Sequence, residues 1–148
     1  MIFIGLGSSL GNAEKIFKSA EQALELLNVH VMKKSNILRN PPFGGVAKNE
    51  FSNAVWQIET DQSPEALLTI LHAVEEEHGR TRETRWADRT LDLDILIFDA
   101  VIMNTDKLTI PHSRIANRKF VLQPLRELVD ENFEIPTLGL LGTLFPSE

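Results

Sequence analysis

The chain contains no cysteine, which excludes disulfide bonds and thiolate metal sites. No apolar run approaches about 18 residues, so we expect no membrane-spanning helix and no membrane partner. Residues 1–6 have no basic segment and too short an apolar run for a signal peptide, and a cytoplasmic location is expected by default.

Basic residues are also fewer than acidic ones. The chain has 15 Lys and Arg and 21 Asp and Glu, for a net charge of −6. That balance argues against general nucleic-acid binding.

The remaining composition is that of an ordinary globular protein. Hydrophobic residues make up 43% of the 148 positions and charged residues 24%, close to the average for globular domains. A chain of this length can bury a sizeable core and usually forms one unit. We therefore expect a single domain over residues 1–148.

Residues 89–98 carry the most informative pattern. Apolar side chains alternate with others, which predicts an extended strand whose one face is formed by Leu91, Leu93, Ile95 and Ile97. Asp92 and Asp94 then lie side by side on the other face, roughly 7 Å apart. Two carboxylates at this spacing suit Mg²⁺, which prefers one or two carboxylates together with ligand phosphates. On this stretch alone, a solvent-facing strand that binds nothing remains an open alternative.

A basic segment comes directly before this strand. Residues 80–89 contain four arginines, a tryptophan and two acidic residues, for a net charge of +2. Arginine suits bidentate contact with phosphate and stacks on aromatic rings. The two segments together predict metal-dependent chemistry on a polyphosphate, although a solvated charged loop would explain the arginines alone.

The helices and strands follow each other in a recognisable order. Ser63 followed by Pro64 is typical of a helix start, and Gly79 of a helix end. The periodicity predicts strands over 2–6, 29–38, 51–60 and 91–97, helices over 13–27, 63–79 and 120–129 with Pro124 early in the last, and a hairpin around 104–106. The order β-α-β-β-α-β predicts an α+β fold of the ferredoxin-like split βαβ type. Its sheet should be antiparallel-dominated, with helices packed on it in α/β/α layers.

Three further positions allow two interpretations each. Phe51 and Asn53 share one strand face, which suits a flat heteroaromatic ligand, although Asn53 could instead bond the backbone. Phe43 lies in a loop over 39–50 and either anchors that loop or faces a ligand. Glu75 is interpreted as a surface carboxylate paired with an arginine, or as a contact for a ligand hydroxyl.

These motifs together resemble one family. The segments that carry the resemblance are Gly7-Ser8, Asn40-Pro41-Pro42-Phe43-Gly44, Phe51-x-Asn53, Glu75 with Gly79-Arg80-x-Arg82, Trp86-x-x-Arg89-Thr90-Leu91-Asp92-Leu93-Asp94-Ile95, Pro111-His112 and Asn117-Arg118-x-Phe120. They resemble the 6-hydroxymethyl-7,8-dihydropterin pyrophosphokinases, which transfer pyrophosphate from ATP to a pterin hydroxymethyl group in folate biosynthesis. The resemblance spans residues 2 to about 125.

The resemblance implies a role for each matching position. It implies two Mg²⁺ ions at Asp92 and Asp94, and catalytic arginines at Arg80 and Arg89. It implies ATP contacts at His72, Glu75, Arg82, Trp86, Ile95, Lys107, Thr109, His112 and Arg118. It implies pterin contacts at Gly7, Asn40, Pro41, Phe43, Phe51, Asn53 and Phe120. The expected partners are thus small-molecule substrates, with ATP as co-substrate.

Two rival functions stay open at this point. A metal-dependent nucleotidyl or glycosyl transferase could also use an Asp-x-Asp strand, but it gives no reason for the set Phe51, Asn53 and Phe120. A non-catalytic relative that binds pterin or nucleotide should bind ATP without turnover. Substrate screening distinguishes both from the pyrophosphokinase.

Overall fold

The computed structural model describes residues 1–9, 12–40, 51–79, 91–113, 115 and 118–145. Its main sheet is built from β1 Ile2–Ser8, β2 His30–Lys34, β3 Leu38–Asn40, β4 Phe51–Glu59 and β5 Asp92–Phe98. The strand order is β2-β4-β1-β5, with β3 also pairing with β4, and every pairing is antiparallel. This is the split βαβ arrangement, so the predicted α+β fold is confirmed.

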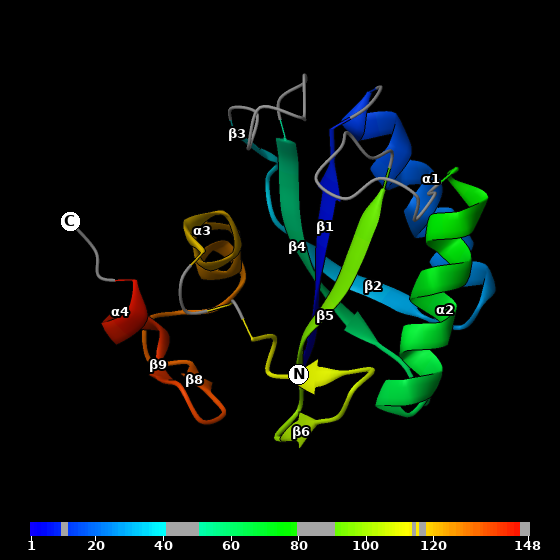
Figure 1. The fold of residues 1–148 in the computed structure, drawn as a ribbon. Helices are drawn as coiled ribbons and strands as arrows, with labels where there is room; N and C mark the ends of the chain where they lie inside the picture. Colours follow the sequence, from blue (N-terminus) through cyan, green and yellow to red (C-terminus); the bar gives the residue numbers. More distant parts are fainter. Residues whose placement is uncertain (10–11, 41–50, 80–90, 114, 116–117, 146–148) are drawn as a thin grey trace.

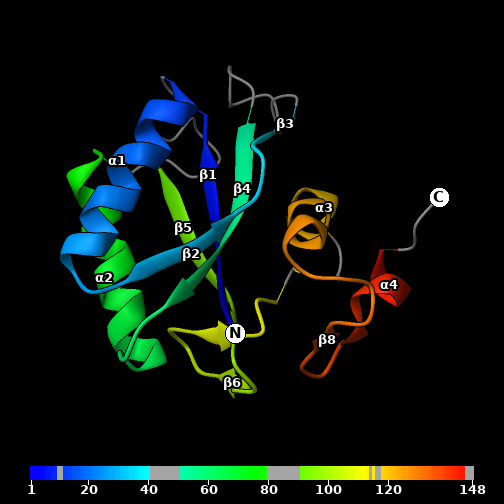
Figure 2. The same cartoon turned by 180° about the vertical axis from the view of Figure 1, so that it is seen from behind.

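The helices lie on both faces of this sheet (Figure 1). α1 Ala13–Leu26 and α2 Pro64–Glu77 cover one face, while α3 Lys119–Leu128 and the short α4 Leu141–Leu144 lie on the other. The reverse view in Figure 2 shows the same three layers. Two small hairpins complete the described chain: β6 Met103–Asn104 with β7 Thr109–Ile110, and β8 Glu134–Ile135 with β9 Gly139–Leu140.

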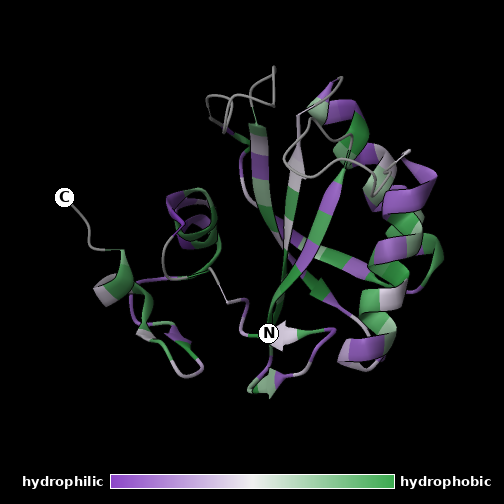
Figure 3. Cartoon of the chain, in the orientation of Figure 1, coloured by the Kyte–Doolittle hydropathy of each residue, from purple (hydrophilic) through white to green (hydrophobic). Residues whose placement is uncertain are grey.

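Each face of the sheet buries its own hydrophobic core. The first core lies under α1 and α2 and includes Ile4, Leu24, Trp56, Leu71, Leu93 and Ile95. The second core lies under α3 and α4 and includes Phe3, Val55, Leu96, Ile97, Leu122, Leu125 and Leu141. The helices show hydrophilic and hydrophobic bands in Figure 3, as amphipathic helices between a core and solvent should.

Helix boundaries follow the capping residues. The Asn12 side chain accepts a hydrogen bond from the Lys15 backbone N–H at the start of α1. Ser63 does the same for Ala66 at the start of α2, with Pro64 in the first turn, as predicted. Gly79 has a φ of +80° just after α2, the left-handed conformation that a glycine adopts without strain.

A bulge in β5 corrects the predicted alternation of that strand. Ile4 pairs with Ile95 but Phe3 pairs with Ile97, so Leu96 is an extra residue opposite β1. Leu96 and Ile97 therefore both face the second core. The prediction that Ile97 shares a face with Leu91, Leu93 and Ile95 was wrong, because an inserted residue reverses the face of every later residue in the strand.

Other differences from the predictions are smaller. β1 continues to Ser8 instead of ending at residue 6, and the predicted strand over 29–38 is divided into β2 and β3. Pro124 lies in the middle of α3. Among the described residues, no helix is long and apolar enough to cross a membrane.

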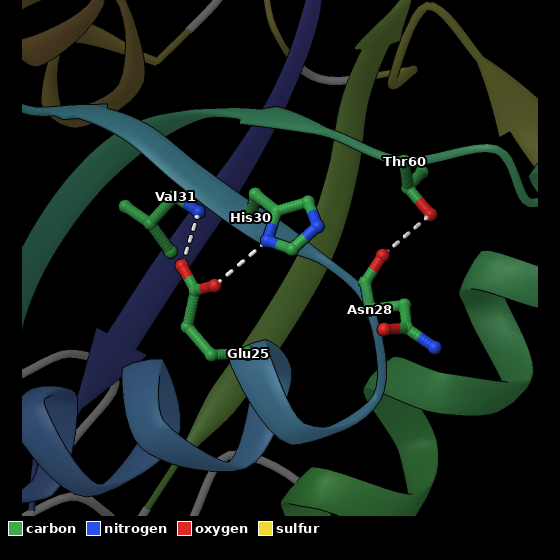
Figure 4. Close-up of polar contacts among 5 residues, drawn as sticks. All are labelled: Glu25, Asn28, His30, Val31 and Thr60. Atoms are coloured by element: carbon green, nitrogen blue, oxygen red, sulfur yellow. Dashed lines mark hydrogen bonds and ion pairs between the residues drawn. The ribbon is translucent and has the colours of Figure 1, made fainter.

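A polar cluster joins the α1–β2 turn to β4 at the end of the sheet where β1 begins (Figure 4). The Glu25 carboxylate accepts a 2.9 Å hydrogen bond from the Val31 backbone N–H and lies 2.8 Å from His30 Nδ1. The Val31 bond first, and the His30 contact second, hold the pKa of Glu25 below its usual value of 4.5. The Thr60 hydroxyl donates to the carbonyl oxygen of Asn28, whose φ of +63° makes the turn.

Candidate functional site

The candidate site lies where β1 ends and β4 and β5 begin, at the top of Figure 1. There Gly7 of the central strand pairs with Asn53 on one side and with Asp92 on the other. The three residues form a row across three strands, on the face that carries the second core further along. The strand register thus brings together two predicted pterin contacts and a predicted metal ligand.

Gly7 keeps the centre of this row free of a side chain. A Cβ placed there would lie 3.3 Å from Asn53 Nδ2 and 3.6 Å from the Asp92 Cβ. Because the glycine leaves this space, the Asn53 amide and the Asp92 carboxylate flank a flat strip of backbone. Such a strip, with hydrogen-bonding groups at its borders, suits a planar polar ligand.

Asp94 occupies the next position on the same face of β5. It pairs with Gly5, just as Asp92 pairs with Gly7, so both carboxylates stand beside glycines of β1. Asp92 is half-buried and Asp94 exposed. Two unit charges about 7 Å apart in this setting repel by roughly 2–3 kcal/mol, and a cation between them would relieve that repulsion.

Aromatic rings lie on the same face from two elements. Phe51 lies two residues before Asn53 on β4, and α3 packs on β4 and β3 from that side. Phe120 lies in the first turn of α3, and both rings are half-buried. The Arg118 guanidinium carbon lies 5.0 Å from the centre of the Phe120 ring, a cation–π contact that orients the ring.

The predicted nucleotide contacts have different environments. Glu75 is 2 % exposed, so its interpretation as a surface carboxylate was wrong. Ile95 is also 2 % exposed and packs in the first core, which leaves only its backbone for a ligand. His72 is half-buried on α2 and Lys107 is exposed.

Two more of these contacts lie on the segment after β6. The Thr109 hydroxyl lies 3.3 Å from Asn104 Oδ1. The backbone N–H of His112 donates to the Leu96 carbonyl at 2.9 Å. That bond fixes the His112 backbone against β5, two residues beyond Asp94.

Several predicted residues lie outside the described part of the chain. They are Pro41, Phe43, Arg80, Arg82, Trp86 and Arg89. The backbone of Asn40 is described, and it pairs with Phe51 at the end of β3.

Among the described residues, no group of three or more His, Cys, Asp or Glu side chains could hold a metal ion. The donor set there is the pair Asp92 and Asp94. This is the set that Mg²⁺ takes when substrate phosphates supply further oxygens, so the residues present fit a phosphate-bound ion.

Sequence reasoning missed a second polar group at this end of the sheet. Ser8 pairs with Ser52 across β1 and β4, and both are nearly fully buried. Arg39 of β3 donates to the Ser52 hydroxyl at 3.3 Å and to the Glu14 carboxylate of α1. The signal for this group was a polar residue at the end of each strand, but only the register shows that they meet.

The comparison with known proteins identifies the family. The family model described as 7,8-dihydro-6-hydroxymethylpterin-pyrophosphokinase (HPPK) matches residues 3–130. The chain belongs to the HPPK family. Every predicted site residue, from Gly7 to Phe120, lies inside the matched range, and the resemblance seen in the motifs is confirmed.

Individual relatives are similar in sequence to this chain over most of its length. A 2-amino-4-hydroxy-6-hydroxymethyldihydropteridine pyrophosphokinase of Haemophilus influenzae is 40% identical over 130 residues, covering 87% of this chain and 81% of the relative. Its namesake in Bacillus subtilis is 40% identical over 133 residues, covering 87% and 78%. That of Pseudomonas aeruginosa is 35% identical over 131 residues, covering 88% and 81%. The similarity to HPPK relatives thus extends beyond the short motifs to most of the chain.

Proposed function

We propose that this chain transfers the pyrophosphoryl group of ATP to the hydroxymethyl group of 6-hydroxymethyl-7,8-dihydropterin, a step of folate biosynthesis. The hydroxymethyl oxygen attacks the β-phosphorus, and the bond from that phosphorus to the oxygen bridging to the α-phosphate breaks. AMP leaves, the pterin diphosphate forms and the hydroxyl proton is released. The observation that carries this proposal is the row Asn53–Gly7–Asp92 in a member of the HPPK family.

The pterin binds over the glycine strip in this proposal. Its flat ring fits between Phe51 and Phe120, and its polar edge meets the Asn53 amide above Gly7. Stacking and an amide contact together recognise a heteroaromatic ring, because each alone accepts many ligands. Asn40, Pro41 and Phe43 complete the pterin contacts that the family resemblance implies.

Asp92 and Asp94 would hold Mg²⁺, with two ions expected. When bound, the metal would neutralise phosphate charge and polarise the oxygens that it contacts. The protein's own part is to present both carboxylates on one strand face, each paired with a glycine of β1. If either carboxylate is removed, the other one alone no longer forms the pair that would hold a phosphate-bound metal.

The charged groups proposed for the triphosphate come from three separate segments. Arg80, Arg82 and Arg89 precede β5, the metal ligands Asp92 and Asp94 lie on it, and His112 and Arg118 come after it. Their role is charge neutralisation along the triphosphate, with Arg80 and Arg89 acting on the transferring group. The remaining nucleotide contacts are assigned to His72, Trp86, Ile95, Lys107 and Thr109, whereas the buried Glu75 is not included.

Cations spread along the triphosphate favour pyrophosphoryl transfer over transfer of the γ-phosphate alone. A γ-transfer site needs only one phosphoryl group in line, while attack at the β-phosphorus requires that both the β and γ groups be held. The test is incubation with ATP, the hydroxymethyl pterin and Mg²⁺, with products separated by chromatography. AMP should rise in step with pterin diphosphate, and ADP as the main product would overturn the proposal.

The same reaction distinguishes the rival functions. A nucleotidyl transferase would release inorganic pyrophosphate and leave a pterin–AMP adduct of different mass. A non-catalytic relative would bind ATP in titration calorimetry and form no product. The cytoplasmic location and the absence of nucleic-acid partners remain predictions from the sequence.

A further inference from the structure

The Glu75 carboxylate lies in the interior, at the contact between α2 and β5. Its Oε2 accepts a 2.7 Å hydrogen bond from the backbone N–H of Leu93. Glu75 follows the buried Val74 and lies four residues after the buried Leu71, so it extends the inward-facing stripe of α2. The residue is 2 % exposed. A charged group in an apolar stripe requires a specific partner there, because burial of an unpaired charge is costly.

The position of β5 at the edge of the sheet explains this partner. Among the described strands, whose order is β2-β4-β1-β5, β5 has a neighbour on one side only. In an antiparallel ladder, the backbone groups of successive residues point alternately to the two edges. The Leu93 N–H, which meets Glu75, thus points away from β1. Leu93 is 2 % exposed, so this amide needs an acceptor within the protein.

The bond is made between the two candidate metal ligands. Leu93 separates Asp92 from Asp94, and these aspartates pair with Gly7 and Gly5 of β1. The backbone of this segment is therefore held by β1 on one side and by α2 on the other. A rotation of the Leu93 peptide would tilt both carboxylates at once, because they are its direct neighbours.

We propose that Glu75 is a positioning residue for the acidic pair. Its hydrogen bond to Leu93 fixes the backbone between Asp92 and Asp94, so that both carboxylates can serve the same Mg²⁺–phosphate site. This rests on the proposed function only in taking the pair as the metal ligands. Groups behind the ligands of a metal site commonly change metal affinity or activity about 10- to 100-fold when removed.

A positioning role for Glu75 and a direct contact with ATP would change different kinetic quantities. A residue that touches ATP changes the KM for ATP, and the Mg²⁺ requirement at saturating ATP stays the same. A residue that positions Asp92 and Asp94 changes the Mg²⁺ requirement. The burial of Glu75 favours the second effect, because the side chain has almost no surface for a ligand.

The test compares three variants in full-length protein. Glu75→Leu keeps an apolar stripe and removes the acceptor, Glu75→Gln keeps an acceptor oxygen without the charge, and Glu76→Leu is the control at an exposed site on the same helix. Two quantities are measured: hydrogen exchange of the Leu93 amide by NMR without metal, and the Mg²⁺ concentration that gives the half-maximal rate.

Glu75→Leu should accelerate exchange at Leu93 and raise the Mg²⁺ requirement about 10- to 100-fold, with an unchanged KM for ATP at saturating Mg²⁺. Glu75→Gln should give an exchange rate and a Mg²⁺ requirement much closer to those of the unsubstituted protein. Glu76→Leu should give the same values as the unsubstituted protein. Unchanged exchange at Leu93, or a raised KM for ATP with an unchanged Mg²⁺ requirement, would overturn the proposal.

Two further measurements test the proposal if Glu75→Leu does not fold or if the protein makes no AMP. If Glu75→Leu does not fold, Glu75→Gln decides: a protected Leu93 amide and an unchanged Mg²⁺ requirement support the proposal, and a raised KM for ATP refutes it. If the unsubstituted protein makes no AMP, the proposed function fails separately. Broadening of the Asp92 and Asp94 amide signals by Mn²⁺ then still tests the positioning, and it is measured in the unsubstituted protein, Glu75→Leu and Glu75→Gln. Loss of broadening only in the variant whose Leu93 amide is unprotected supports the proposal. Broadening that is independent of Leu93 protection refutes it.

Discussion

Replacement of Gly7 by alanine tests the proposed pterin strip most directly. The new Cβ would lie 3.3 Å from Asn53 Nδ2, which is closer than ordinary contacts, but 3.6 Å from the Asp92 Cβ, which is an ordinary contact. The Asn53 amide must therefore move by a few tenths of an ångström, while Asp92 can stay in place. We expect weaker pterin binding and nearly unchanged ATP binding.

The magnitude is set by the hydrogen bonds at risk. Misplacing one or two amide hydrogen bonds costs about 1–2 kcal/mol, which corresponds to about a 5- to 30-fold higher Kd for the pterin. The fold should survive, because Gly7 is not among the positive-φ glycines of the described chain. Alanine in a strand is more stable than glycine by about 0.5–1 kcal/mol, which offsets part of the steric cost.

Gly5→Ala is the matched control for this variant. It lies on the same face of β1, but its Cβ would meet the flexible Leu96 side chain at 3.3 Å instead of the Asn53 amide. Titration calorimetry with pterin and with an ATP analogue, together with thermal unfolding, measures all three effects. Pterin affinity in Gly7→Ala equal to that in Gly5→Ala would refute the strip, and parallel loss of both ligands would indicate a general distortion.

Three further predictions use other parts of the molecule. Asp92→Asn and Asp94→Asn should each abolish most turnover while circular dichroism stays unchanged, and near-normal Mg²⁺-dependent rates in both would contradict the metal assignment. Phe120→Ala should weaken pterin binding about tenfold, since stacking on one ring contributes roughly 1–3 kcal/mol, with ATP binding measured in parallel as the control. Glu25→Gln should lower the Tm at pH 7. Because the lowered pKa of Glu25 contributes stability that is present above pH 4.5 and lost as pH falls through the folded-state pKa, the Tm difference should shrink in that acidic range; a difference that stays constant down to about pH 3 would exclude this linkage.

Much of the fold was predictable because its signals are local. Ser63 with Pro64, and Gly79 at the other end, determine the limits of α2 through capping chemistry that involves neighbouring residues only. The alternation over the first half of β5 correctly places Asp92 and Asp94 opposite the first core. Local patterns of this kind need no knowledge of the partner strands.

The features that the sequence did not predict depend on contacts between distant segments. The row Asn53–Gly7–Asp92 arises from strand register, which no single segment contains. The burial of Glu75 was missed because a carboxylate among helix residues usually faces water, and its acceptor role becomes visible only when α2 and β5 are together. The roles of the site residues stay predictions, because those roles depend on bound ligands.

The bulge at Leu96 also has a consequence for changes in chain length. In a regular strand, insertion or deletion of one residue turns every later side chain to the opposite face. Here Leu96 is already the extra residue, and without it the alternation from Asp92 to Phe98 would be regular, with Ile97 toward α3 and Phe98 toward α1 and α2 as they are now. The strand can thus lose a residue at this one point and keep both aspartates on their present face. Homologous or engineered strands that differ in length by one residue should therefore differ at the bulge.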